Sequence, residues 1–170
     1  MNKIKVFSTL SGYQLTWLAC VFGDSKFNEP FLGIYFGSIF FLIYFYFNKK
    51  KINLLKICFL ISIPGYFFDT LMVYFSIYEF NSSLIIGTIP IWMSVLWLSF
   101  SILFDEILNI FKKYKTTGIF LSGSLGPLTY YLGEPIGIIS INNIVMFFIL
   151  MILFWILLMV YYLYFILKNY

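Results

Sequence analysis

Long apolar runs alternate with short polar segments along the 170 residues of the chain. A helix needs about 20 apolar residues to cross the hydrocarbon core of a bilayer. The pattern therefore predicts an all-α fold: a polytopic membrane helical bundle of six transmembrane helices, forming a single integral membrane domain over residues 1–170. The predicted spans are residues 6–22, 31–47, 54–78, 84–104, 117–139 and 142–167.

The lysines gather at alternate junctions between these runs, and their placement predicts an orientation. Basic residues are enriched in the cytoplasmic loops of membrane proteins. The opposite junctions hold only Lys26, which stands beside Asp24 and Glu29. We therefore expect a multi-pass membrane protein with both termini cytoplasmic. The lysines assigned to the cytoplasmic side are Lys3, Lys5, Lys49, Lys50, Lys51, Lys56, Lys112, Lys113, Lys115 and Lys168.

Composition narrows the partners and the chemistry. The chain is 62% hydrophobic and only 11% charged, whereas a soluble domain is about half apolar and a quarter charged. Its net charge of +4 follows from the lysine bias, so we expect membrane lipids and other membrane proteins as partners, and no nucleic acid. The chain has no histidine, no arginine and two cysteines. We therefore expect no metal and no cofactor, and any chemistry rests on carboxylates, hydroxyls, tyrosines or lysines.

Asp69 is the ionisable residue placed deepest in an apolar run. A charge at the centre of a transmembrane helix costs about 2.5–3.5 kcal/mol on insertion scales, so such a residue has a partner or a function. It serves as a proton carrier, a base or an anchor for a cationic substrate, or else it is protonated or bonded to a neighbouring helix. Helical spacing groups it with Ser62, Gly65, Tyr66 and Ser76, and turns Leu60, Phe67, Leu71, Tyr74 and Tyr78 toward lipid.

Two runs are interrupted by proline and glycine, which bend a helix and allow close approach. Pro64-Gly65 precedes Asp69 by one turn, and Gly126-Pro127 precedes Tyr130 and Glu134. Interrupted helices at membrane depth often line binding sites, although small-residue packing explains the same pattern. Three polar side chains fall in parallel helices, and we expect them to converge on an outward-opening pocket: Gln14, Asp69 and Glu134.

The cytoplasmic boundary of the fourth run carries an acidic pair, Asp105 and Glu106. The pair is solvated or bonded to Lys112 and Lys113, or it binds Mg²⁺ weakly or performs acid–base work at the headgroups. The last run, residues 144–167, is almost purely apolar. We expect it to be an outer, lipid-facing helix without chemistry.

Four stretches, in this order, resemble a family of small bacterial inner-membrane proteins known as domain of unknown function 2878. The resemblance covers most of the chain and implies a helical membrane fold. It also implies a site built from Gln14, Trp17, Asp69, Trp92, Pro127 and Tyr130, and it favours a link to fatty-acid modification. Where the family pattern has Asn-His this chain has Asp105-Glu106, so no histidine-based role carries over. The stretches are residues 13–23, Gly65-Tyr66-Phe67-Phe68-Asp69, Pro90-Ile91-Trp92 with Trp97, and 126–130 with Gly133.

Three functions remain open at this level. The first is a lipid-linked role within the bilayer, enzymatic or accessory, with Asp69 as the principal polar group and Tyr130 or Glu134 as its catalytic partner. The second is a small-solute permease or the substrate-binding subunit of a transporter. The third is a structural membrane scaffold without a site. For the first two we expect substrate to contact Gln14, Trp17, Tyr66, Trp92, Trp97 and Pro127.

Overall fold

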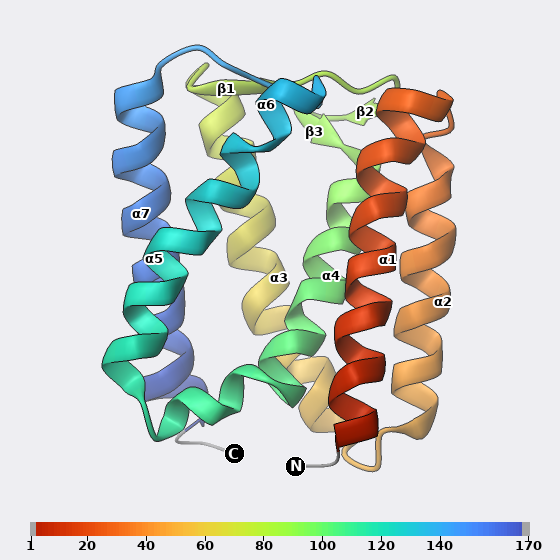
Figure 1. The fold of residues 1–170 in the computed structure, drawn as a ribbon, viewed down its shortest axis with the longest axis vertical. Helices are drawn as coiled ribbons and strands as arrows, with labels where there is room; N and C mark the ends of the chain where they lie inside the picture. The colour runs from red at the N-terminus through yellow and green to blue at the C-terminus, as the bar shows by residue number, and fades with distance from the viewer. Residues whose placement is uncertain (1–2, 168–170) are drawn as a thin grey trace.

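The computed structural model describes residues 3–167, apart from the side chains of Lys3, Asp105 and Asn109. The prediction of an all-α fold is confirmed, because six long helices stand side by side along one axis in this part of the chain (Figure 1). These helices are α1 (Lys3–Phe27), α2 (Phe31–Phe47), α3 (Lys51–Tyr74), α4 (Ile91–Glu106), α5 (Lys115–Tyr131) and α7 (Ile144–Tyr161). A π-helical turn, η2 (Tyr162–Ile166), extends α7.

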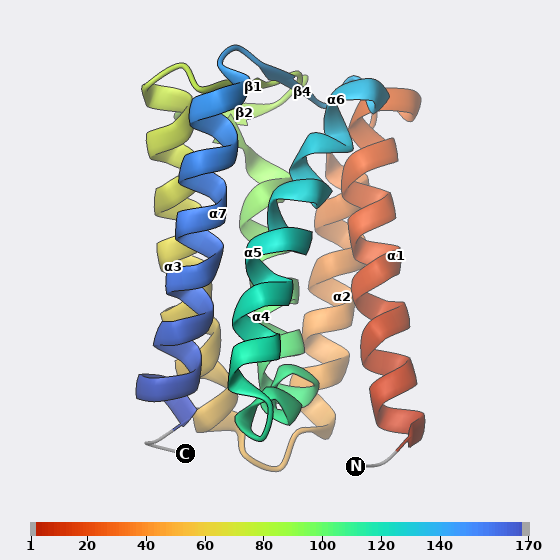
Figure 2. The same ribbon diagram turned by 60° about the vertical axis from the view of Figure 1, so that its left-hand side comes forward.

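One end of the bundle holds both chain ends and most of the lysines. Figures 1 and 2 place the two termini at the same end as the α2–α3 turn and the 3-10 turn η1 (Leu108–Lys112). Among the described residues two helices are long and apolar enough to cross a membrane, Lys51–Tyr74 and Ile144–Ile166. Shorter apolar helices span Phe31–Phe47 and Ile91–Phe104.

The other end carries short strands where the sequence predicts helix. The segments are β1 (Tyr78–Phe80), β2 (Ile85–Ile86), β3 (Ile89–Pro90), a one-turn helix α6 (Gly133–Ile136) and β4 (Ile139–Ile141). β1 pairs antiparallel with β4, and β2 with β3. The predicted spans 54–78, 84–104 and 117–139 are therefore too long at this end.

Local backbone geometry explains where α3 stops. Ser76 has a positive φ of 53°, and its N–H donates to the carbonyl of Val73 at 2.9 Å. The N–H of Ile77 donates to the carbonyl of Met72 at 3.0 Å. These are the paired bonds of a Schellman motif, which satisfies the last carbonyls and turns the chain out of the helix. Residues 78–80 are thereby free to form a strand.

Two groups of helices make up the bundle. α1 and α2 pack on each other and on α4, and α4 packs on α3. α5 packs chiefly on α7. In Figures 1 and 2, α1 and α5 lie on the same side of the bundle with α4 behind them. The strands β1 and β4 join the two groups at the end opposite the termini.

Two glycines and two tryptophans hold the groups together at mid-height. The Trp97 and Trp155 rings are stacked, with centroids 5.7 Å apart and planes 23° apart. A Cβ on Gly65 would lie 2.4 Å from the Trp97 ring, and one on Gly126 would lie 2.3 Å from the Trp155 ring. Only glycine leaves room for these contacts, which join α3, α4, α7 and α5. The close approach predicted from both glycines is confirmed.

Candidate functional site

A buried carboxylate, Asp69 near the end of α3, accepts hydrogen bonds from three aromatic side chains. Tyr78 Oη donates to Oδ1 at 2.6 Å and Trp97 Nε1 donates to Oδ2 at 2.6 Å. Tyr130 Oη lies 3.0 Å from both carboxylate oxygens. Asp69 is fully buried. An acceptor-only group with donors on both oxygens satisfies the requirement that a buried charge be hydrogen-bonded.

The three donors come from three elements distant in sequence. Trp97 projects from α4, where Gly65 admits its ring against α3. Tyr130 lies on α5, one turn after Gly126-Pro127, where the helix continues without a break. Tyr78 belongs to β1, and its prediction as a lipid-facing residue was wrong, because it is completely buried. The helical spacing that placed it on the lipid side ends at Tyr74, before the chain turns at Ser76.

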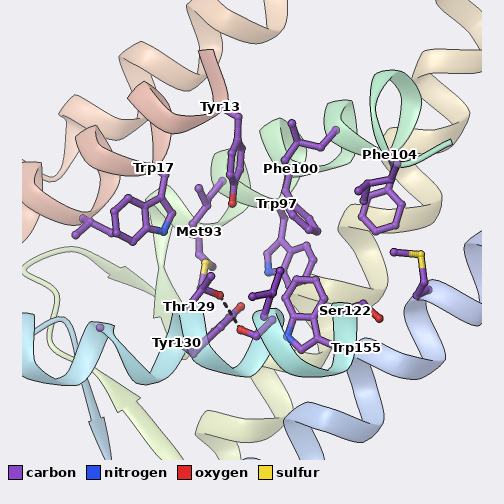
Figure 3. Close-up of a pocket in the computed structure, with 18 of the residues that line it drawn as sticks. Tyr13, Trp17, Met93, Trp97, Phe100, Phe104, Ser122, Thr129, Tyr130 and Trp155 are labelled. Atoms are coloured by element: carbon purple, nitrogen blue, oxygen red, sulfur yellow. Dashed lines mark hydrogen bonds between the residues drawn. The ribbon is translucent and has the colours of Figure 1, made fainter. Parts of the chain in front are cut away.

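A cavity of about 330 Å³ lies between the α1–α4 group and the α5–α7 pair (Figure 3). No charged side chain lines it, and most of its lining is aromatic or aliphatic. Leu125 belongs to the lining and is 55% exposed, so the cavity reaches the outer surface of α5. The predicted site residues that line it are Trp17, Trp92, Trp97 and Tyr130.

The other predicted substrate-binding residues lie outside this lining. Gln14 is on the exposed face of α1, and Tyr66 and Pro127 pack within α3 and α5. Glu134 is exposed in α6, where its Oε1 accepts from the N–H of Ile141 at 3.1 Å. In the described part of the chain neither Gln14 nor Glu134 bonds to Asp69. The expected convergence of these three side chains is therefore not found.

A second carboxylate, Asp24 of α1, is bonded in a similar way at the strand end of the bundle. Trp92 Nε1 donates to its Oδ2 at 2.9 Å, and Ser82 Oγ donates to the same oxygen. The Ser83 hydroxyl and N–H donate to Oδ1 at 2.7 Å and 3.2 Å. This group was missed by sequence reasoning, which assigned Asp24 only to a polar junction. Trp92 thus donates to Asp24 and also lines the cavity.

Two tryptophans of α4 therefore hold two buried aspartates. Trp92 and Trp97 are five residues apart on one helix, and each indole N–H points to a carboxylate from another element. The spacing of tryptophans in an apolar run was the only sequence signal for this arrangement. Because each ring also lines the cavity, the two aspartates fix the orientation of a large part of its wall.

The structure describes the side chain of only one member of the predicted acidic pair, Glu106. The side chain of Asp105 lies outside the described residues. Glu106 Oε2 forms an ion pair with Lys5 and accepts a hydrogen bond from Tyr44 Oη at 2.8 Å. Glu106 thus ties α4 to α1 and α2 at the lysine-rich end, rather than pairing with the predicted Lys112 or Lys113.

α7 contributes to the cavity, although the sequence predicted a purely lipid-facing helix. Trp155 and Met159 belong to the lining, and Phe147, Met151 and Leu158 are buried behind them. An all-apolar run shows no polar face against which a buried face can be recognised. The single tryptophan of this run, Trp155, was the one sign in the sequence of a buried face, and it stacks on Trp97.

Comparison with known proteins identifies the family but no activity. Residues 7–161, nearly the whole chain, match the model of a family described as "Protein of unknown function (DUF2878)". The resemblance drawn from the sequence motifs is therefore confirmed. No curated protein and no solved structure matches the chain.

Proposed function

We propose that this chain, which belongs to the DUF2878 family, is a six-span inner-membrane protein that accommodates an acyl chain of a membrane lipid in its central cavity. Its role would then be in membrane lipid or fatty-acid modification, as an enzyme or as an accessory factor. The observation that carries this proposal is the cavity itself, which is large, uncharged and lined mainly by aromatic and aliphatic side chains.

The distribution of charge supports the membrane orientation. Lys5, Lys50 and Lys113 lie toward the end of the bundle that holds both termini, and Lys26 lies in the last turn of α1 at the other end. Positively charged residues favour the cytoplasmic side. The outward surface is strongly apolar, with exposed side chains such as Phe59, Phe67 and Phe120. These features favour six spans with both termini in the cytoplasm.

The position of the cavity supports entry from the bilayer. α5 is held chiefly by α7, and contact between α5 and α1 is sparse. Leu125 joins the cavity lining to the exposed face of α5. A ligand already dissolved in the membrane would reach the cavity sideways, without crossing water. Because the acyl chain is already in hydrocarbon, its entry gains no hydrophobic transfer free energy, and van der Waals packing against the cavity's aromatic rings is what favours binding.

Asp69 acts in this proposal as a positioning residue. Both of its oxygens already accept hydrogen bonds, and it does not belong to the cavity lining. The side chains that it orients, Trp97 and Tyr130, do line the cavity. Loss of the carboxylate is therefore expected to act on ligand binding through the tilt of these two rings.

The test compares lipids that copurify with the natural chain and with two matched serine variants of α5. Ser122 lines the cavity and Ser124 does not. Each hydroxyl donates to a carbonyl of its own helix, at 2.8 Å and 2.9 Å. Ser122→Phe should fill the cavity and remove bound lipid from the purified protein, measured by mass spectrometry, while Ser124→Phe should retain it. Equal lipid content in all three proteins would contradict the proposal.

Whole-lipid mass spectrometry of cells then tests the cellular role. A lipid species lost on deletion, restored by the natural chain and by Ser124→Phe but not by Ser122→Phe, would establish modification linked to the cavity. An unchanged lipid profile would favour the alternative of a small-solute permease or transporter subunit, for which radiolabelled uptake is the assay. If Ser122→Phe complements the deletion fully in both assays, the remaining explanation is a structural scaffold without a site.

A further inference from the structure

The polar atoms around the cavity are unevenly satisfied, and this bears on which lipid it takes. Most of them bond within the protein. Trp92 and Trp97 donate to the two aspartates, and Tyr130 donates to Asp69. The hydroxyls of Ser122 and Thr129 donate to backbone carbonyls of α5, at 2.8 Å and 2.7 Å.

Two donors in the lining, the Tyr13 hydroxyl and Trp17 Nε1, are in no hydrogen bond within the described chain. Both belong to α1, and neither side chain is fully buried. Trp155 Nε1 also has no partner among the described residues, but it is buried, so a ligand in the cavity does not reach it. Figure 3 shows Tyr13 and Trp17 reaching from α1 toward the labelled side chains of α4 and α5. A ligand that displaces water from these two donors must supply acceptors, because a donor left buried without a partner costs about 1–3 kcal/mol.

The cavity offers donors and no charge. The lining includes no lysine to neutralise a phosphate or a carboxylate, and an unpaired ion in such surroundings is strongly disfavoured. Tyr13 and Trp17 are four residues apart and so share one face of α1. A ligand therefore needs acceptors against this one wall of an otherwise apolar space, and ester or ketone carbonyls are neutral acceptors of this kind.

We infer that the cavity selects an uncharged lipid whose head carries carbonyl acceptors, such as an acylglycerol, over lipids with an anionic head. This inference rests on the proposed function and adds the substrate class to it. The acyl chains would fill the apolar part of the cavity. The carbonyls would accept hydrogen bonds from the Tyr13 hydroxyl and from Trp17 Nε1 on the α1 wall.

The test uses three probes with equal chains: dioctanoylglycerol, its dioctyl ether analogue without carbonyls, and dioctanoyl phosphatidic acid. Binding to the purified full chain in detergent is measured at equilibrium. We expect the diester to bind about five-fold more tightly than the diether, the difference made by one net hydrogen bond. Phosphatidic acid should bind more weakly than the diester. Equal binding of diester and diether, or tighter binding of phosphatidic acid, would overturn the inference.

Variants assign the discrimination to particular donors. Trp17→Phe keeps an aromatic ring and removes the N–H, and Tyr13→Phe removes only the hydroxyl. Each should lower the ratio of diester to diether affinity toward one, while Tyr131→Phe, on an exposed residue outside the lining, should preserve it. A ratio unchanged in both donor variants would also overturn the inference. Should Trp17→Phe not fold, Tyr13→Phe and the probe pair on the natural chain still decide it.

The failure of this inference is distinguishable from failure of the proposed function. Ser122→Phe should abolish binding of diester and diether alike. Suppose that Ser122→Phe abolishes binding but the natural chain binds diester and diether equally. That result would support an acyl-chain cavity and contradict selection for carbonyls. Absence of binding by every probe, or binding unaffected by Ser122→Phe, would overturn both.

Discussion

Trp97 Nε1 donates to Asp69 Oδ2 across 2.6 Å, and both side chains are buried. The bond joins α4 to α3 in the same layer where Gly65 admits the Trp97 ring. It gives a buried carboxylate one of its three donors and gives an indole on the cavity wall a fixed orientation. Stability and the shape of the cavity therefore depend on the same contact.

Replacement of Asp69 by asparagine should destabilise the protein by about 1–3 kcal/mol. The amide offers one acceptor oxygen and one amino group where three donors now converge, so an indole N–H or a phenol faces another donor. The measurement is thermal unfolding of the detergent-purified protein, with Glu79→Gln as the control because Glu79 is exposed. Unfolding temperatures that agree for Asp69→Asn and the natural chain would contradict this account of the carboxylate.

Alanine in place of Gly126 should cost about 1–3 kcal/mol by overpacking, and leucine should prevent folding. The added Cβ would lie 2.3 Å from the Trp155 ring, which cannot move away without leaving its stack on Trp97. Trp155→Leu in the same chain should recover part of the loss, since it removes the ring that clashes. Chemical denaturation of the single and double variants measures both effects. If the losses in free energy of unfolding add in the double variant, the clash with the Trp155 ring is not the cause.

Sequence reasoning predicted the helical class and the importance of Asp69, because hydrophobic runs and an isolated charge within one are local signals. It misplaced Tyr78, since the turn at Ser76 depends on a positive φ at a residue other than glycine. Hydrophobic periodicity carries no sign of such a turn. The helix was therefore extended past Tyr74, and one of the two donors that lie 2.6 Å from Asp69 was assigned to the lipid side.

The remaining parts of the site depend on contacts between distant residues. Asp24 and Trp92 are 68 positions apart, and nothing in either local sequence indicates that they meet. The buried face of α7 was also hidden, because apolar residues surround Trp155 on every side of that helix. The packing of α7 on α5, together with its ring contacts to α3 and α4, determines that this face turns inward.

The bonding of Asp24 should make stability fall in acid. Burial raises the pKa of the Asp24 carboxyl, but hydrogen bonds from Ser82, Ser83 and Trp92 outweigh this, so the pKa lies below its ordinary value. A lowered pKa contributes stability above the unfolded value of about 3.9, and this contribution is lost as the pH falls through the folded value. Thermal unfolding between about pH 6 and pH 3 should show a smaller decline in Asp24→Asn than in the natural chain. Parallel declines in the two proteins would exclude this contribution.

Cysteine labelling tests the orientation of the six proposed spans. Lys50 and Lys113 are exposed at the end that holds the termini, and Glu29 is exposed in the α1–α2 connection at the other end. Cys20 and Cys58 are buried, so background labelling of the natural chain by a membrane-impermeant maleimide should be low. Glu29→Cys should be labelled in intact cells, whereas Lys50→Cys and Lys113→Cys should be labelled only after the membrane is opened. The reverse pattern would show that the orientation is the opposite of the one proposed. Labelling of all three variants in intact cells would contradict the membrane-spanning arrangement itself.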